Sequence, residues 1–294
     1  MVATFASAAS GPASATRSAL LAPRLALAAC VRGYVARSTL GATLRPEQRD
    51  NHFPATPLCS LCWIFQGESR LLRRGEQACD EAIAPISVLG PHTQPVLTHN
   101  PGPVETLIVS LTPQAMAALT GIGMDALVNR VLPLDQVLDA AWQTMAQAVF
   151  AAPDTPSRIE LVENFLEPRW QALAPDTVST AARYRFWAEN LALRAAQTGW
   201  GNSLRQAERR IKQWAGLPMR DLRRMVRAEN SFFQVREAHS LGAVDWADAA
   251  ADAGFSDQAH MCREVRRISG LSPAALLKAI EEDESFWLYR LTDA

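Results

Sequence analysis

The side chains with the clearest chemistry lie near the C-terminus. Residues 254–273 read GFSDQAHMCREVRRISGLSP, with Arg263, Arg266 and Arg267 close together. A guanidinium group presents a planar fork of N–H donors, which binds phosphate oxygens or the acceptor edge of guanine through paired hydrogen bonds. This segment therefore indicates an anion-binding surface, although a solvated helix face can have the same composition.

The spacing of apolar residues predicts that these arginines lie on an amphipathic helix over 257–268. Met261, Val265 and Ile268 follow one another at +4 and +3 and so share one face. Ser256 or Asp257 can cap the helix start, Gly254 can form a left-handed turn, and Gly270 with Pro273 can end the helix. One face should then pack, while the other stays free for a partner.

The same pattern occurs 54 residues upstream, in SLRQAERRIKQWAGLPMR at 203–220. Ala207, Ile211 and Trp214 repeat the apolar spacing, while Arg209 corresponds to Arg263 and Lys212 to Arg266. We interpret this as an internal duplication. Each copy follows another predicted helix and a glycine turn, as in a helix-turn-helix.

The segment between the copies, from Pro218 to about Leu241, predicts a long connecting helix that is buried on one side. Its apolar residues include Leu222, Met225, Val226, Phe232, Phe233 and Val235. The major groove admits one helix, so two helices held rigidly apart can enter neighbouring turns of a duplex, about 34 Å apart. We therefore expect double-stranded DNA to be the partner.

Charge is unevenly distributed along the 294 residues, whose formal net charge is -1. Residues 183–278 hold 16 basic and 10 acidic residues, residues 1–182 hold 12 and 15, and residues 279–294 hold 1 and 5. A basic segment within an acidic chain is consistent with a surface that faces phosphates.

The ending GFSDQAH…CREVRRISGLSP resembles the signature of the AraC/XylS family of bacterial transcription regulators. The match covers about residues 200–280. The resemblance implies two helix-turn-helix subdomains joined by a long helix. The implied base contacts are Arg205, Glu208, Arg209, Gln258, His260, Cys262 and Arg263, and the implied phosphate contacts are Arg210, Lys212, Arg266 and Arg267.

The sequence also departs from the family pattern. Met261 and Val265 stand where the family usually has aromatic or bulkier core residues. The first helix of the upstream subdomain, at about 183–198, is the weakest match. A structural role is the alternative at several sites, since His260 can cap the helix and the other cations can be solvated.

The N-terminal part predicts a different architecture. From about 20 to 112, short apolar runs are separated by proline and glycine residues. This pattern favours a small β-sandwich or barrel. Helical spacing follows at 134–150 and 157–172, and these helices either pair across a homodimer or cover the β-module. The expected fold class is α+β, with a disordered tail at 1–18, a β-rich sensor or dimerisation domain at 19–180, a tandem helix-turn-helix domain at 181–280, and an acidic tail at 281–294.

The stretch HFPATPLCSLCWIFQGE at 52–68 resembles sensor domains fused to one branch of the same family. The resemblance implies a pocket for a small-molecule effector, with His52, Trp63 and Phe65 as its lining. For the two aromatic residues, packing in the core is the alternative.

Cys59 and Cys62 form a Cys-x-x-Cys pair, but a metal site would need further ligands. In a strand the two side chains point to opposite faces, so buried thiols are the simpler interpretation. A redox regulator that acts through this pair is a further hypothesis. No cofactor, metal or enzymatic activity is expected, because the sequence contains no nucleophile elbow, phosphate-binding glycine loop or His-x-x-x-His element.

Composition bears on the location of the protein. The five cysteines are irregularly spaced and no run of about 18 apolar residues occurs, which favours a cytoplasmic protein with reduced thiols and no membrane partner. We expect a nucleoid-associated transcription regulator for which RNA polymerase is a possible partner. The alternative is a metal- or small-molecule-binding β-module whose helical tail binds other proteins.

Overall fold

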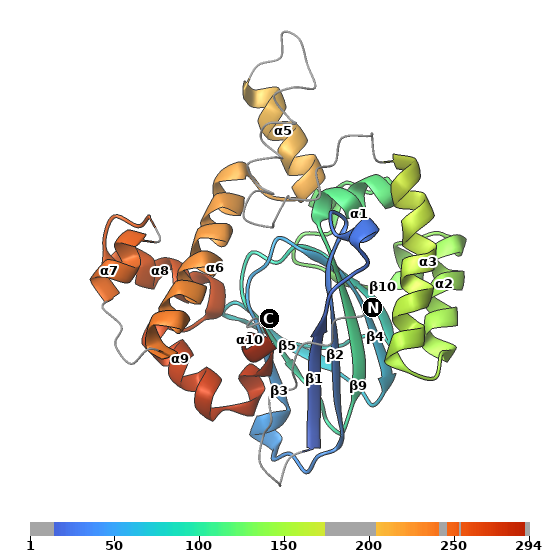
Figure 1. Cartoon of the computed structure of the whole chain (residues 1–294), viewed down its shortest axis with the longest axis horizontal. Coiled ribbons are helices and arrows are strands. Elements are labelled where there is room, and N and C mark those ends of the chain that lie inside the picture. The colour runs from blue at the N-terminus through green and yellow to red at the C-terminus, as the bar shows by residue number, and fades with distance from the viewer. Residues whose placement is uncertain (1–14, 174–203, 241–245, 253, 292–294) are drawn as a thin grey trace.

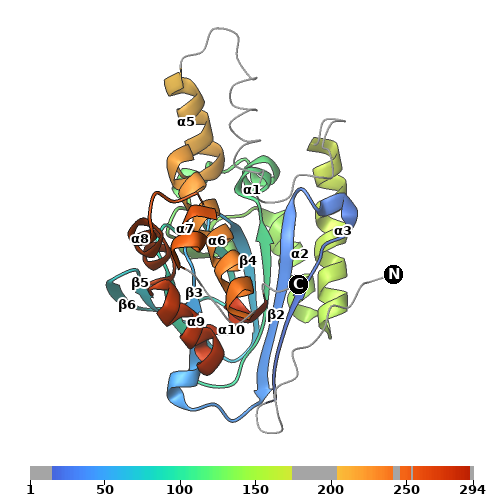
Figure 2. The same ribbon diagram turned by 60° about the vertical axis from the view of Figure 1, so that its left-hand side comes forward.

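The computed structural model describes residues 15–173, 204–240, 246–252 and 254–291. Its fold class is α+β, as the sequence predicts (Figure 1). The N-terminal part consists of two antiparallel sheets with helices packed against them, and the C-terminal part is helical. Helices α6 to α9 lie on one side of the sheets, and α2 and α3 lie on the other (Figures 1 and 2).

The first sheet has six strands in the order β1-β2-β9-β4-β7-β10. Alternate residues of β9 are buried, namely Leu107, Val109 and Leu111, as expected for a sheet with one face against the core. The strands are β1 (Ala15–Leu21), β2 (Val31–Gly41), β9 (Glu105–Leu111), β4 (Cys59–Gln66), β7 (Ile86–Leu89) and β10 (Val131–Pro133).

The second sheet has four strands in the order β3-β8-β5-β6. They are β3 (Asp50–Phe53), β8 (Val96–His99), β5 (Arg70–Arg74) and β6 (Gln77–Ala82). Gly75, with a φ of 58°, makes the turn between β5 and β6. In β3, Asn51 is buried and the other residues are half-buried, so this strand has side chains available for a second layer.

Helices close the core of the first sheet. They are α1 (Pro113–Thr120), α2 (Ala140–Ala151) and α3 (Thr155–Leu173), with short 3₁₀ turns at η1 (Leu25–Leu27), η2 (Pro46–Arg49), η3 (Met124–Ala126) and η4 (Leu134–Gln136). The indole N–H of the fully buried Trp63 donates to the carbonyl of Ala146 in α2 over 3.0 Å. The helices expected at 134–150 and 157–172 thus cover the β-module; their pairing in a dimer stays a prediction.

The C-terminal helices are α5 (Leu204–Ala215), α6 (Met219–Ser240), α7 (Trp246–Asp252), α8 (Gln258–Ser269) and α9 (Pro273–Glu282). Their apolar residues form two clusters. Ile211, Leu222 and Ile268 belong to the cluster shared by α5, α6 and α8. Met261, Val265 and Leu276 belong to the one shared by α7, α8 and α9.

Part of each expected tail is ordered in the structure. Strand β1 begins at Ala15 and pairs with β2, so residues 15–18 belong to the sheet, while residues 1–14 lie outside the described residues. At the other end, η5 (Glu284–Phe286) and α10 (Trp287–Arg290) bury Phe286, Trp287 and Tyr289. The prediction of an acidic tail over 281–294 was based on charge and did not take these three aromatic side chains into account. Their burial stabilises the segment by more than the conformational entropy lost when it becomes ordered.

Candidate nucleic-acid interface

The local geometry of α8 follows its sequence. The Asp257 carboxylate caps the helix by accepting the amide N–H of His260 over 2.6 Å, and this bond, with one from the Ser256 hydroxyl, lowers the pKa of Asp257. Gly254 and Gly270 adopt left-handed φ values of 73° and 85° before and after the helix. Met261, Val265 and Ile268 are buried as expected. The helix is therefore fixed along one side and at both ends.

The opposite face of α8 is open. Gln258, Arg263 and Arg266 are exposed, whereas His260, Cys262 and Arg267 are half-buried. Arg267 is held by Glu264, with 3.2 Å between its Nη2 and the carboxylate Oε2. The expected base-reading residues of this copy thus lie together at the start and outer face of one helix.

His260 has a structural role in addition to its place at this surface. Its ring packs edge-on against Phe255 with centroids 5.3 Å apart, and its Nδ1 lies 3.2 Å from the Ser256 hydroxyl. These contacts keep the ring at the edge of the exposed face.

Helix α5 repeats the pattern of α8. Ile211 and Ala215 are buried, Trp214 packs beside them, and Glu208 and Arg209 are exposed. Lys212 is exposed and Arg210 half-buried, whereas the side chain of Arg205 lies outside the described residues. The helix expected at 183–198 also lies outside them.

The buried face of α5 packs against η3 and α1 of the N-terminal part. After α5, Gly216 turns with a φ of 74°, and a Cβ placed there would lie 2.8 Å from Val128 Cγ2. A helix that should face DNA thus rests directly on the β-rich domain.

The connecting helix α6 has 22 residues. Its rise of about 1.5 Å per residue gives a length of about 33 Å, and its bounds match the expected segment. Leu222, Met225 and Val226 are buried as predicted, and the side chains of Phe232, Phe233 and Val235 lie outside the described residues.

A buried carboxylate joins α6 to α8. Glu264 accepts a hydrogen bond from Arg224 of α6 over 2.7 Å and pairs with Arg267. Burial alone would raise the pKa of Glu264, but these two guanidinium groups outweigh it and lower the pKa. The carboxylate therefore stays charged and holds both arginines.

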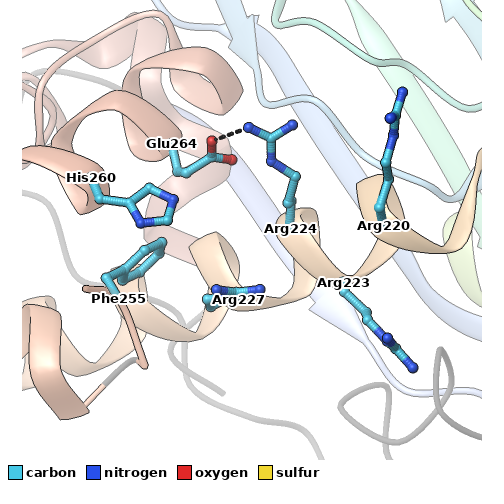
Figure 3. A pocket seen from close by; sticks show the side chains of 7 residues that line it. All are labelled: Arg220, Arg223, Arg224, Arg227, Phe255, His260 and Glu264. Carbon is cyan, nitrogen blue, oxygen red and sulfur yellow. Dashed lines mark hydrogen bonds and ion pairs between the residues drawn. The ribbon is translucent and has the colours of Figure 1, made fainter. Parts of the chain in front are cut away.

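A group of arginines on α6 was not among the site residues predicted from the sequence. Arg220, Arg223, Arg224 and Arg227 line a pocket of about 350 Å³ between α6 and α8 (Figure 3). Their spacing of i, i+3, i+4 and i+7 was visible in the sequence, but only the packing of α8 reveals the wall opposite them. Phe255, His260 and Glu264 form that wall.

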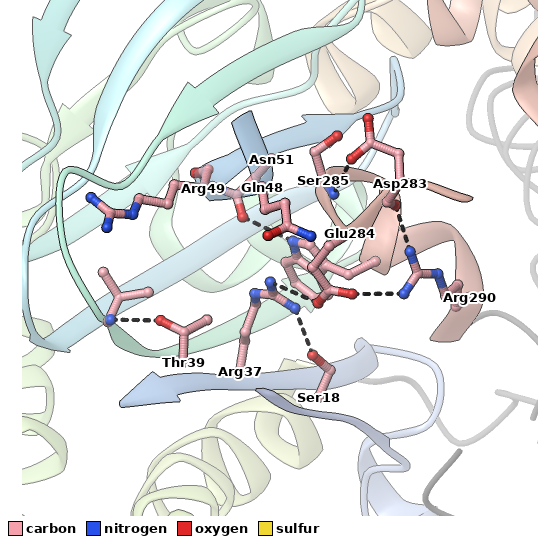
Figure 4. A network of polar contacts seen from close by, with 12 residues as sticks. Ser18, Arg37, Thr39, Gln48, Arg49, Asn51, Asp283, Glu284, Ser285 and Arg290 are labelled. Atoms are coloured by element: carbon pink, nitrogen blue, oxygen red, sulfur yellow. Dashed lines mark hydrogen bonds and ion pairs between the residues drawn. The ribbon is translucent and has the colours of Figure 1, made fainter. Parts of the chain in front are cut away.

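A polar network ties the C-terminal segment to the sheets (Figure 4). Glu284 of η5 lies 3.2 Å from the buried Arg37 of β2 and 2.8 Å from Arg290. The Trp287 indole N–H donates to the Asn51 side chain over 2.9 Å. In addition, the amide of Ala55 donates to the carbonyl of Ile268 over 2.8 Å, so the end of α8 contacts the N-terminal domain directly.

The expected effector-pocket residues occupy two separate environments. The His52 ring stacks on Phe286 of η5 with centroids 4.1 Å apart, and burial lowers its pKa. Trp63 and Phe65 instead face α2 and α3. The Phe65 ring lies 5.8 Å from that of Phe150 in α2, and the Arg158 guanidinium of α3 lies 3.5 Å above the Phe65 ring. The structure does not bring His52 together with the other two.

Cys59 and Cys62 are buried in β4, and burial raises the pKa of Cys59 well above its usual range and that of Cys62 to about 12. Among the described residues, no group of three or more His, Cys, Asp or Glu side chains is placed to hold a metal ion. In the same part of the chain, no helix is both long and apolar enough to cross a bilayer.

No protein-family model and no curated protein matches this chain. Among solved structures, it is similar to one of ToxT from Vibrio cholerae, at 8% identity and a TM-score of 0.36, over 91% of this chain and 98% of that one. A structure of unsaturated fatty acid bound wild-type ToxT matches at 10% identity and a TM-score of 0.34, over 78% and 94% of the two chains. The likeness is remote.

Proposed function

We propose that this protein is a sequence-specific DNA-binding transcription regulator of the AraC/XylS type. The observation that carries the proposal is the geometry of α8. Its apolar stripe is buried and its N-terminus capped, while Gln258, Arg263 and Arg266 are exposed on the outer face. A helix with these properties can enter the major groove with its cations free to bind.

Helix α5 supports the proposal as a second reading helix. It exposes Arg209 and Lys212 at the places equivalent to Arg263 and Arg266 of α8, with Glu208 exposed beside them, and α6 links the two helices. In this proposal Arg209 and Arg263 each bind a guanine edge, together with Arg205, Glu208, Gln258, His260 and Cys262 at the bases. Arg210, Lys212, Arg266 and Arg267 neutralise phosphates.

The N-terminal domain would sense a small molecule or hold two copies of the chain together. Its contacts with α5 and with the end of α8 support a role in controlling how the reading helices meet DNA. A regulator of this kind would act at the nucleoid in the cytoplasm. Bound at a promoter, it would be placed to contact RNA polymerase.

The test is a selection of duplexes from a random pool by the purified chain, followed by gel-shift titration of the enriched sequence. Arg209→Ala and Arg263→Ala should each cost about 1–3 kcal/mol at their own half-site. Arg17→Ala, which removes an exposed arginine of β1, is the matched control and should have no such effect.

Two outcomes would count against the proposal. If both variants stayed folded by circular dichroism and bound the selected duplex as wild type does, the assignment of base contacts would be wrong. If wild type enriched no sequence at all, the regulator proposal itself would fail, and the helical part would be better tested as a protein-binding surface.

A further inference from the structure

The pocket between α6 and α8 has a charge that its own lining does not balance. Glu264 is the one carboxylate among the described residues that line it, and Arg224 and Arg267 already bind that group. Among the described residues, Arg223 and Arg227 have no carboxylate partner, and Arg220 lies 3.8 Å from its neighbour Asp221. The pocket is therefore cationic.

The arrangement of these arginines has an energetic cost in the isolated chain. Positions 220, 223, 224 and 227 lie on one face of α6, at separations where like charges repel. Glu264 relieves this repulsion at Arg224, and Asp221 lies 3.8 Å from both Arg220 and Arg224, which leaves Arg223 and Arg227 without a nearby carboxylate among the described residues. An anion that enters the pocket would relieve the rest.

The volume of the pocket and its guanidinium lining indicate which kind of anion fits it. Its volume of about 350 Å³ holds a phosphate group with part of its substituents. Guanidinium groups match the oxygens of a phosphate through paired hydrogen bonds. On the opposite wall, Phe255 and His260 pack edge-on and add no negative charge to that of Glu264, which Arg224 and Arg267 already pair (Figure 3).

The position of the pocket indicates where that phosphate comes from. His260 and Glu264 belong both to the pocket wall and to α8, so the pocket lies beside the exposed Arg263 and the half-buried Arg267 of the same helix. When a helix occupies the major groove, the phosphate backbone runs along its flank.

We infer that the pocket between α6 and α8 binds a phosphate of the DNA backbone through Arg220, Arg223 and Arg227. That the phosphate belongs to DNA rests on the proposed function. That the pocket binds a phosphate rests on its arginines alone. These arginines hold the duplex in register against α8 and read no bases.

The variant that tests the inference combines Arg223→Gln with Arg227→Gln. Arg224 is left intact because its loss would leave the buried Glu264 short of a partner. The matched control combines Arg17→Gln with Arg45→Gln, two exposed arginines of the N-terminal domain, and changes the net charge equally.

Fluorescence anisotropy with a mixed-sequence duplex across a salt series gives the first measurement. The slope of log affinity against log salt should become shallower by about one unit in the pocket variant, as expected when one phosphate is no longer neutralised, and stay unchanged in the control. The selected and the mixed-sequence duplex should lose affinity by the same factor. A slope equal to that of the control would overturn the inference while leaving the regulator proposal intact.

The second measurement is thermal melting of the protein with and without sodium tripolyphosphate. The polyanion should raise the melting temperature of wild type and of the control variant, but not of the pocket variant. If wild type bound no duplex yet showed this selective shift, the pocket would take a free phosphorylated anion and the proposed function would be wrong. If wild type showed neither effect, both proposals would fail.

Discussion

Trp287 of α10 donates its indole N–H to the Oδ1 of Asn51 in β3 over 2.9 Å, across 236 positions of the chain. The guanidinium of Arg37 lies 4.3 Å above the same indole ring and pairs with Glu284. The last helical turns thus act as a clasp between the helical part and both sheets, with Trp287 at its centre.

Replacement of Trp287 should weaken this clasp in two distinguishable steps. Trp287→Phe keeps most of the packing but leaves the buried Asn51 oxygen without its donor, at a cost of about 1–3 kcal/mol in the free energy of unfolding. Trp287→Ala also removes the buried ring and should cost about 3–5 kcal/mol. Urea unfolding followed by circular dichroism measures both, with Leu25→Ala, at a side chain that is 73% exposed, as the control.

If the clasp joins the two parts cooperatively, Trp287→Ala should also split a single unfolding transition into two. An unfolding curve of Trp287→Ala that matched the Leu25→Ala curve would show that α10 contributes nothing to the stability of the fold.

Gly216 and Gly254 form a matched pair for testing the contact between α5 and the N-terminal domain. Both have φ values near 74°, at 74° and 73°, but a Cβ at Gly216 would strike Val128, whereas one at Gly254 would meet nothing within 4 Å. Gly254→Ala should therefore cost only the backbone strain, about 1 kcal/mol. Gly216→Ala should cost more, by an amount that thermal unfolding can measure. Equal costs would mean that α5 does not rest on Val128 in solution.

The lowered pKa of Glu264 predicts how stability depends on pH. A carboxyl group whose pKa is lower in the folded chain than in the unfolded chain stabilises the fold above the unfolded value, here 4.5, and loses this contribution as the pH falls through the folded value. Glu264→Gln should therefore be less stable than wild type at neutral pH, and the difference should shrink below about pH 4.5.

Denaturant titrations of wild type and Glu264→Gln at several pH values measure this difference. Glu81→Gln is the control, because its carboxylate pairs with Arg74 at the surface and should contribute much less. A difference for Glu264→Gln that did not depend on pH would contradict an ionised, paired Glu264.

Thiol accessibility separates buried cysteines from a redox pair. Burial raises the pKa values of Cys30 and Cys62 to about 12 and that of Cys59 further, so these thiols should resist iodoacetamide at pH 8 in the native chain. Cys79 and Cys262 are half-buried and should react first. Mass spectrometry of labelled peptides, with urea-unfolded chain as the control, gives the order. Fast labelling of Cys59 or Cys62 would revive the redox hypothesis.

The local features of the candidate interface could be predicted well from the sequence. The apolar spacing of α8, its Asp257 cap and its terminal glycines involve residues within one or two helical turns, so their pattern is enough to specify the helix. The bounds of α6 follow in the same way. The partial burial of Arg267 could not be predicted, because it depends on Glu264 being held from α6 as well.

The separation of the effector-pocket residues has a similar explanation. Trp63 and Phe65 are two residues apart on β4 and share a face by the period of a strand, but the neighbour of that face, α2, lies more than 70 residues away in the chain. His52 packs on Phe286, from the opposite end of the sequence. Nothing local to position 52 marks this contact.

The sequence by itself determined the amphipathic helices, their caps, the repeat at 54 residues and the division into a β-rich and a helical part. These properties depend on the nearest turns of the chain and on the period of apolar residues. Only the tertiary structure decided that α5 rests on the β-rich part, that Trp287 reaches Asn51, and that four arginines of α6 line a pocket together with His260 and Glu264 of α8. Such contacts depend on which apolar faces bury one another over long separations in the chain, and spacing alone does not encode that choice.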